Sequence, residues 1–242
     1  MTKFEFCLWL VQPVYLPLYQ MVRRRLLELT VSAPFTLCIL DVGGRKSHYT
    51  VGIPAAITVT DLPRCSTVQE QLHLGITPQI TQQLLSRRTN IKAVLLDDMT
   101  KSSLPDARFD IVVAVEVLEH VAEDELFVSQ VRRVLKPGGT FLMTTPNGDS
   151  VKNTNPDHKR HYRRVELDCL LRRHFNEVDV RYAVLGNRFY SAGLKSWSVR
   201  HPVQTMLSMF GNFVCSVQSS RKTMRDQALG TQHLCATAVK AS

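Results

Sequence analysis

Four acidic side chains each follow a short apolar run of the chain: Asp41, Asp61, Asp98 and Glu116. If those runs are parallel strands, their carboxyl ends meet at one edge of a sheet, where α/β proteins bind ligands. Asp61 lies about twenty residues beyond Gly43 and Gly44, where a carboxylate can accept both hydroxyls of a ribose. Asp98 and the backbone of Met99 are placed to contact an adenine edge. Helix capping would explain Asp61 and Asp98 singly. It does not predict four acids in register, so the pattern favours an adenosine-type cofactor.

A second group that could do chemistry begins with Glu116, Glu119 and His120. Positions i, i+3 and i+4 share one face of a helix, so we expect these side chains to project together. His158 follows in the tract 155–162, after the next apolar run, and could supply a fourth ligand. Carboxylate and imidazole donors suit Mg²⁺, Mn²⁺ or Zn²⁺, although spacing alone selects none of them.

The chemistry of this second group would be the activation of a hydroxyl. A bound cation lowers the pKa of a hydroxyl and positions it for attack. Without a metal, His120, His158 or His161 could act as a general base. The structural alternative is a segment that simply packs against the sheet, because a lone histidine is more often a surface or structural residue.

The elements that must position these side chains follow from hydrophobic patterning. Seven strands are expected, at 36–40, 56–60, 93–96, 110–115, 139–145, 177–184 and 233–240. Helices are expected between them, at 79–88, 123–135 and 165–175. This alternation predicts a Rossmann-like, doubly wound, mostly parallel sheet with right-handed crossovers.

We expect one domain, since 242 residues fit a single large α/β unit. It would comprise an N-terminal cap (1–34), a core (35–184), an inserted lid (185–230) and the last strand (231–242). The apolar stretch 4–19 in the cap lacks the charge order of a signal peptide and is too short to span a bilayer. It could lie on a membrane surface, but such a segment more often packs over a cofactor site.

Several ordered motifs resemble those of class I S-adenosylmethionine-dependent methyltransferases. They are Ile39-Leu40-Asp41-Val42-Gly43-Gly44, Thr60-Asp61, Leu96-Asp97-Asp98-Met99, Arg108-Phe109-Asp110-Ile111-Val112, Glu116-Val117-Leu118-Glu119-His120-Val121 and Arg133-Val134-Leu135-Lys136-Pro137-Gly138-Gly139. The resemblance covers about residues 36–182 and implies S-adenosylmethionine as the cofactor. It places the Asp41–Gly44 turn at the methionine part, Asp61 at the ribose, and Asp98 with Met99 at the adenine. The expected cofactor-binding set is Asp41, Gly43, Gly44, Arg45, Asp61, Leu62, Asp98, Met99 and Glu116.

Arg45 departs from the family pattern, which usually has a further glycine at this position. Its side chain would either crowd the carboxylate of the cofactor or pair with it, as a guanidinium can. Crowding would leave a methyltransferase-like protein that no longer transfers methyl groups. Pairing would preserve the site.

The Glu116–His120 box is also similar to that of small-RNA terminal 2′-O-methyltransferases, where two Glu and a His join a later His around a metal. It likewise resembles the ubiquinone-pathway O-methyltransferases. We expect methyl transfer to an oxygen of a small-molecule, sugar or lipid-linked acceptor, with a metal-dependent RNA 2′-O-methyltransferase as the alternative.

Composition bounds the partners and the compartment. The net charge of +9 and the basic run 159–164, with Arg172 and Arg173, could serve an anionic partner. Tyr162 alone offers an aromatic ring for base stacking there, and no RNA-binding module is recognised, so RNA is not favoured. Six scattered cysteines without a Cys-x-x-Cys pair favour a reducing, cytoplasmic location. The oligomeric state is left open.

Overall fold

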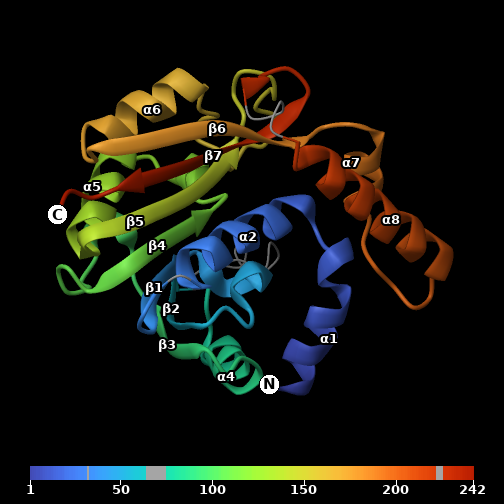
Figure 1. Cartoon of the computed structure of the whole chain (residues 1–242), viewed down its shortest axis with the longest axis horizontal. Coiled ribbons are helices and arrows are strands. Elements are labelled where there is room, and N and C mark those ends of the chain that lie inside the picture. The colour runs from blue at the N-terminus through green and yellow to red at the C-terminus, as the bar shows by residue number, and fades with distance from the viewer. Residues whose placement is uncertain (32, 64–74, 222–225) are drawn as a thin grey trace.

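The computed structural model describes residues 1–31, 33–63, 75–221 and 226–242. Its centre is a seven-stranded sheet in the order β3-β2-β1-β4-β5-β7-β6 (Figure 1). The strands are β1 Leu37–Val42, β2 Ala55–Asp61, β3 Ile91–Leu96, β4 Phe109–Val115, β5 Leu135–Pro146, β6 Glu177–Leu185 and β7 Thr231–Val239. β7 is antiparallel to both of its neighbours, and the other pairs are parallel. The expected Rossmann-like, mostly parallel α/β sheet is confirmed.

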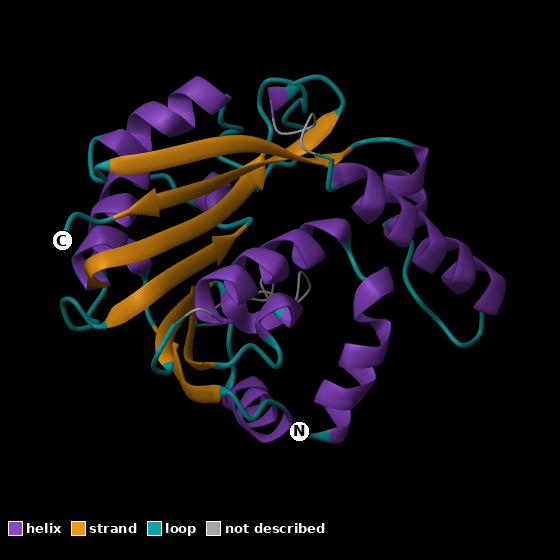
Figure 2. Ribbon diagram, viewed as in Figure 1, coloured by secondary structure: helices purple, strands orange, loops and turns teal. Residues whose placement is uncertain are grey.

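Helices cover both faces of the sheet (Figure 2). They are α1 Lys3–Val11, α2 Pro17–Val31, α4 Pro78–Arg87, α5 Asp124–Val134, α6 Arg164–Arg172, α7 Arg188–Gly193 and α8 Pro202–Ser219. One core packs α5 and α6 against β4 and β5, with Phe127, Val131 and Phe141 fully enclosed. The other packs α2 against β1 and β2, with Leu26 and Ile57 enclosed. Burial on both faces explains why the inner strands are continuous apolar runs rather than alternating ones.

One element differs from the sequence expectation. β5 begins at Leu135, where α5 ends, so the expected turn 136–139 lies inside an irregular extended segment whose pairing with β4 shifts register after Phe109. The apolar stretch between β6 and β7 forms α7 and α8. The division into cap, core and lid stays a prediction. Within the described residues, no helix is long and apolar enough to cross a bilayer.

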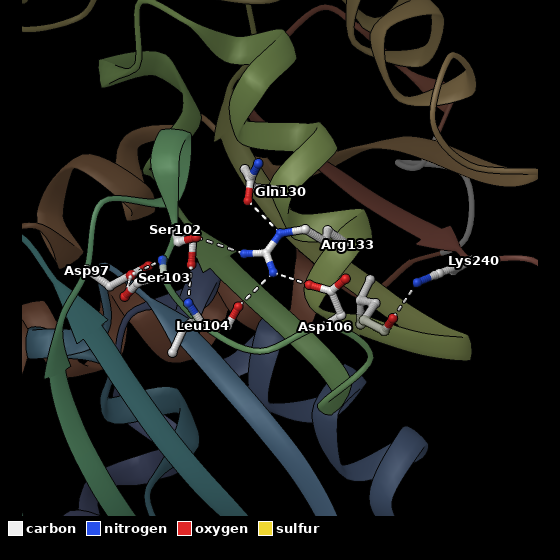
Figure 3. Close-up of polar contacts among 9 residues, drawn as sticks. Asp97, Ser102, Ser103, Leu104, Asp106, Gln130, Arg133 and Lys240 are labelled. Atoms are coloured by element: carbon white, nitrogen blue, oxygen red, sulfur yellow. Dashed lines mark hydrogen bonds and ion pairs between the residues drawn. The ribbon is translucent and has the colours of Figure 1, made fainter.

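The loop after β3 is fastened to α5 by Arg133 (Figure 3). Its guanidinium donates to the backbone oxygens of Leu104 at 2.7 Å and Ser102 at 2.9 Å, and also pairs with Asp106. Asp97 closes the same loop by accepting the backbone N–H of Ser103 at 2.9 Å. These bonds fix the segment that follows β3 and carries Asp98.

The turn after β1 is built around a buried carboxyl group. Asp41 is fully buried and accepts hydrogen bonds from the hydroxyls of Tyr49 at 2.8 Å and Thr50 at 3.3 Å. Gly43 has a φ of +68°, which favours glycine. A Cβ at Gly44 would lie 2.4 Å from Cγ of Asp41, so a side chain there would collide with the carboxyl group. Both glycines are therefore required by the way this turn closes over Asp41.

The burial of Asp41 predicts a pH-dependent stability. Burial raises its pKa from the ordinary 3.8 to about 6, so the folded state holds the proton more tightly than the unfolded state. That contribution is complete below the unfolded pKa and is lost as pH rises through about 6. We expect the unfolding free energy of the wild type to fall, relative to Asp41→Asn, by on the order of 2–3 kcal/mol between about pH 4 and about pH 7.

Urea denaturation of both proteins across this pH range measures the difference. Asp106→Asn, at an exposed carboxylate, serves as the control and should follow the wild type. Parallel curves for the wild type and Asp41→Asn would show that Asp41 has no raised pKa.

Candidate functional site

The strand ends that carry the predicted residues lie along one edge of the sheet. Thr60 pairs with Val42, and its carbonyl accepts the backbone N–H of Gly43 at 2.8 Å. Asp61 pairs with Leu96, at the end of β3, and β1 and β4 are neighbours at the centre. Chains leaving β1 and β4 diverge to opposite faces, which is the topological switch point where open α/β sheets bind ligands. The structure brings the predicted residues to this edge, and their cofactor-binding roles stay predictions.

Arg45 lies in the short 3₁₀ turn Gly44–Lys46 and reaches across to the end of β2. Its Nε is 3.8 Å from Oδ2 of Asp61, and both side chains are largely buried. The backbone N–H of Leu62 donates to Oδ1 of Asp61 at 2.8 Å, while the Leu62 side chain is exposed. Burial raises the pKa of Asp61, and the Leu62 bond and the Arg45 charge oppose that rise. In this structure, Arg45 therefore pairs with the carboxylate that was expected to hold a ribose.

Asp98 begins the 3₁₀ turn Met99–Lys101 and caps it. Its Oδ1 accepts the backbone N–H and the hydroxyl of Thr100, at 3.0 and 2.8 Å. Met99 is buried. The capping role weighed from the sequence is therefore present at Asp98.

Glu116 follows β4 with a φ of +54°, and 118–120 forms a 3₁₀ turn rather than the helix that we expected. The Glu116 carboxylate accepts a hydrogen bond from the Thr144 hydroxyl at 2.9 Å and lies 3.1 Å from Nδ1 of His233. The Tyr190 hydroxyl is 3.2 Å from the other ring nitrogen of His233. Burial acts to raise the pKa of Glu116, but His233 and Thr144 lower it overall. The side chain thus belongs to a Tyr190–His233–Glu116 chain and does not join the expected metal-binding face.

Glu119, His120 and His158 do come together, each with one potential ligand atom within 4.8 Å of the others. Glu119 is fully buried: Oε2 accepts from the Thr145 hydroxyl at 3.1 Å, and Oε1 has no hydrogen-bond partner within the described structure. Burial and the nearby Glu116 raise the pKa of Glu119 well above its usual range. Three of the four predicted ligands therefore form one cluster, and Glu116 lies outside it.

The hydrogen bonds of the histidines fix their neutral tautomers. His161 Nδ1 faces the carbonyl of Val151 at 3.0 Å and must donate to it, which leaves Nε2 as an acceptor. His158 Nδ1, 2.8 Å from that Nε2, then donates, and its own Nε2 keeps a lone pair. His120 Nδ1 likewise donates to the carbonyl of Asp157 at 3.2 Å. His120 and His158 thus each present a basic nitrogen.

Several side chains of the basic run after β5 are engaged in ion pairs within the protein. Arg160 pairs with Asp124 at 2.6 Å, and the Tyr162 hydroxyl donates to the same carboxylate at 2.7 Å. Tyr162 is buried, so its ring is not exposed for base stacking. Arg172 pairs with Asp168, within α6. The run fastens the loop to α5 and α6.

Sequence patterns did not predict His233, Tyr190, Thr144, Thr145 and Arg88 as members of the site. Arg88 is buried and donates to the hydroxyls of Ser47 and Thr50, beneath the turn after β1. His233 meets Glu116 although 116 residues lie between them in the chain. The single usable signal was an isolated arginine or histidine at the end of an apolar element, which is common elsewhere.

Comparison with known proteins gives one matching family model, described as a methyltransferase domain, over residues 66–143. A probable S-adenosylmethionine-dependent methyltransferase of Mycolicibacterium smegmatis is 38% identical over 109 residues, which are 43% of this chain and 41% of that protein. A ubiquinone biosynthesis O-methyltransferase of Rhodopseudomonas palustris is 33% identical over 78 residues, which are 31% of each protein. This chain covers 40–43% of the length of the first curated relatives.

A solved structure of a SAM dependent methyltransferase from Archaeoglobus fulgidus matches with a TM-score of 0.57 and 16% identity. The match covers 92% of this chain and 94% of that one, so the likeness concerns the fold as a whole. Together with the matched domain and the identity to the mycobacterial relative, the fold makes this chain similar to class I S-adenosylmethionine-dependent methyltransferases.

Proposed function

We propose that this chain binds S-adenosylmethionine at the carboxyl edge of β1, β2 and β3 and transfers its methyl group to an oxygen of an acceptor. The observation that carries the proposal is the placement of Asp61 beside the Gly43–Gly44 turn, at the topological switch point of a sheet of this family. The carboxylate can accept both ribose hydroxyls, and the two glycines allow a close approach of the backbone.

The cofactor, when bound, supplies an electrophilic methyl group on a positively charged sulfur. An acceptor oxygen that attacked this methyl group in line would form a C–O bond as the C–S bond broke, and its hydroxyl proton would pass to a base. Nε2 of His158 suits that role because its lone pair is kept available by the His161 bond. Burial, with His120 and His161 nearby, lowers the pKa of His158, so the ring is neutral near pH 7 and can accept the proton.

The class of acceptor rests on likeness alone. One relative is named a ubiquinone biosynthesis O-methyltransferase, which supports oxygen as the acceptor atom. We therefore keep a small-molecule, sugar or lipid-linked acceptor as the proposal, together with a cytoplasmic location. A protein that has lost methyl transfer is the alternative that a binding measurement separates first.

Calorimetry with S-adenosylmethionine tests the cofactor site. We expect binding by the wild type, and a loss of tenfold to a hundredfold in affinity for Asp61→Asn, because the amide replaces a charged acceptor of two hydroxyl bonds. Asp168→Asn, on the outer face of α6, should bind like the wild type. No heat of binding by the wild type at about 1 mM cofactor would favour the alternative that methyl transfer has been lost.

Arg45 gives a second prediction, because its pair with Asp61 must loosen before ribose hydroxyls can take the carboxylate. Arg45→Gln removes this competitor, so we expect S-adenosylhomocysteine and adenosine both to bind about two- to fivefold more tightly. Adenosine lacks the carboxylate of the larger ligand. Weaker binding of S-adenosylhomocysteine with unchanged binding of adenosine would instead show that Arg45 pairs with the cofactor's carboxylate.

A metal-dependent RNA 2′-O-methyltransferase is the second candidate, favoured by the Glu119–His120–His158 cluster. The buried Oε1 of Glu119 has no hydrogen-bond partner within the described structure, and two imidazole lone pairs accompany it. This donor set fits a divalent cation, and the bonds of the opposite ring nitrogens orient the histidines as second partners do in metal sites. A cation held there would lower the pKa of an adjacent hydroxyl.

Electron paramagnetic resonance of Mn²⁺ tests this cluster without an activity assay. If the cluster holds a metal, the wild type binds Mn²⁺, and His158→Ala weakens the affinity by at least about tenfold. His174→Ala, at a part-buried histidine that follows α6 and pairs with Glu125 of α5, should leave the affinity unchanged. Equal binding by the wild type and both variants, or no binding by the wild type, would remove the metal from the proposal.

A further inference from the structure

Helix α8 turns its apolar side away from the protein. Large exposed side chains recur along one stripe, with Val203, Met206, Leu207 and Phe210 between 59% and 70% exposed. The face that packs against the fold is instead small or polar and consists of Ser208, Gly211, Asn212 and Cys215. Surface helices of globular proteins show the opposite arrangement. An exposed apolar stripe of this kind indicates a surface that another apolar phase covers.

The packing of α8 holds this orientation in place. The Ser208 hydroxyl donates to the backbone oxygens of Gly193 and Lys195 and accepts from Nε1 of Trp197 at 3.1 Å. A Cβ at Gly211 would lie 2.8 Å from the carbonyl of Phe189, so the absence of a side chain lets α8 approach α7 closely. If α8 were rotated so that its apolar stripe faced the protein, the Ser208 hydroxyl would lose these hydrogen-bond partners. The stripe is thus a fixed feature of the surface.

The charge of this region indicates which kind of surface it would bind. The described segment 186–221, which carries α7 and α8, contains no Asp or Glu and four Lys or Arg residues. A groove of about 760 Å³ between α7 and α8 combines apolar surface with positive charge. Phe189, Leu207 and Phe210 line it together with Arg188, Lys195 and Arg200. Cations that ring an apolar surface match a bilayer that carries anionic headgroups.

The N-terminal helix adds to the same flank. Phe6, Trp9 and Leu10 of α1 are exposed, and α1 and α8 lie beyond α2, on the side away from α5 and α6 (Figure 1). The rings of Tyr15 and Trp197 meet edge to face at 5.6 Å, which joins the segment after α1 to the one before α8. A partly exposed Trp and Phe at such a flank suit the interfacial region of a membrane.

We propose that the α7–α8 surface, with α1 beside it, docks on an anionic lipid bilayer. A second copy of this chain is disfavoured, because a symmetric contact would bring two acid-free, cationic surfaces together. The inference does not depend on methyl transfer. It also differs from the earlier expectation for residues 4–19 alone, because it assigns the main contact to α8.

Sedimentation with sucrose-loaded vesicles tests the proposal. The wild-type chain should pellet with phosphatidylcholine vesicles that contain about 30% phosphatidylglycerol, much less with pure phosphatidylcholine, and less in about 0.5 M than in about 0.1 M NaCl. Leu207→Gln/Phe210→Gln should weaken the partition coefficient about tenfold or more. Lys195→Glu/Arg200→Glu should abolish the preference for anionic vesicles.

Matched controls keep the same chemistry elsewhere. Leu126→Gln/Val165→Gln changes exposed apolar side chains on α5 and α6, and Arg108→Glu/Arg132→Glu makes the same charge change at exposed positions next to and on α5, on the side away from α1 and α8. Both should bind like the wild type. Thermal unfolding confirms that each variant is folded. Wild-type protein that stays in the supernatant, or α8 variants that bind like their controls, would overturn the proposal. So would a dimer in sedimentation velocity that Leu207→Gln/Phe210→Gln dissociates, since the surface would then belong to a second copy.

Discussion

Asp41 places an ionisable carboxyl group where water cannot reach it, at the end of β1, and the neighbouring loop is organised around that group. The hydroxyls of Tyr49 and Thr50 donate to the carboxyl oxygens. The guanidinium of Arg88 is buried nearby and bonds Ser47 and Thr50, so it supplies opposite charge and links the short turns Gly44–Lys46 and His48–Thr50 of the loop. The turn proposed to bind the cofactor therefore packs directly on a buried polar network.

The N-terminal segment is anchored to this network. Glu5 of α1 accepts the backbone N–H and the hydroxyl of Thr89, next to Arg88, at 2.8 and 2.9 Å. Further along, the Tyr15 hydroxyl lies 2.6 Å from Nδ1 of His48, within the same loop. Movement of α1 would therefore disturb partners of the loop after β1. A flank that docks on a surface through α1 and α8 would then share its contacts with the loop that shapes the cofactor site.

The sequence predicted the sheet and the edge because both depend on local signals. Buried parallel strands are short apolar runs, and a turn such as Gly43–Gly44 needs residues that tolerate its backbone. The contacts between individual side chains were harder to predict from the sequence. Nothing local indicates that Glu116 bonds His233, because the two meet through the order of strands in the sheet. The expectation of a helix at 116–120 failed for a related reason: a spacing of three and four describes a face only if the backbone is helical, and Glu116 has a positive φ.

Helix α8 shows a second feature that local sequence patterns do not determine, namely which side of a helix faces the protein. Its period of apolar residues predicts an amphipathic helix, but period alone does not say which side faces the protein. That choice is made by the close contact of Gly211 with α7 and by the bonds of Ser208, which satisfy a hydroxyl only when it points inward. A buried polar group without its partner costs more free energy than an exposed apolar side chain, so the polar face takes the interior and the apolar face is left outside. The exposed stripe is thus the consequence of satisfying the polar side of the helix, and the basic groove beside it is what gives that stripe a specific lipid partner.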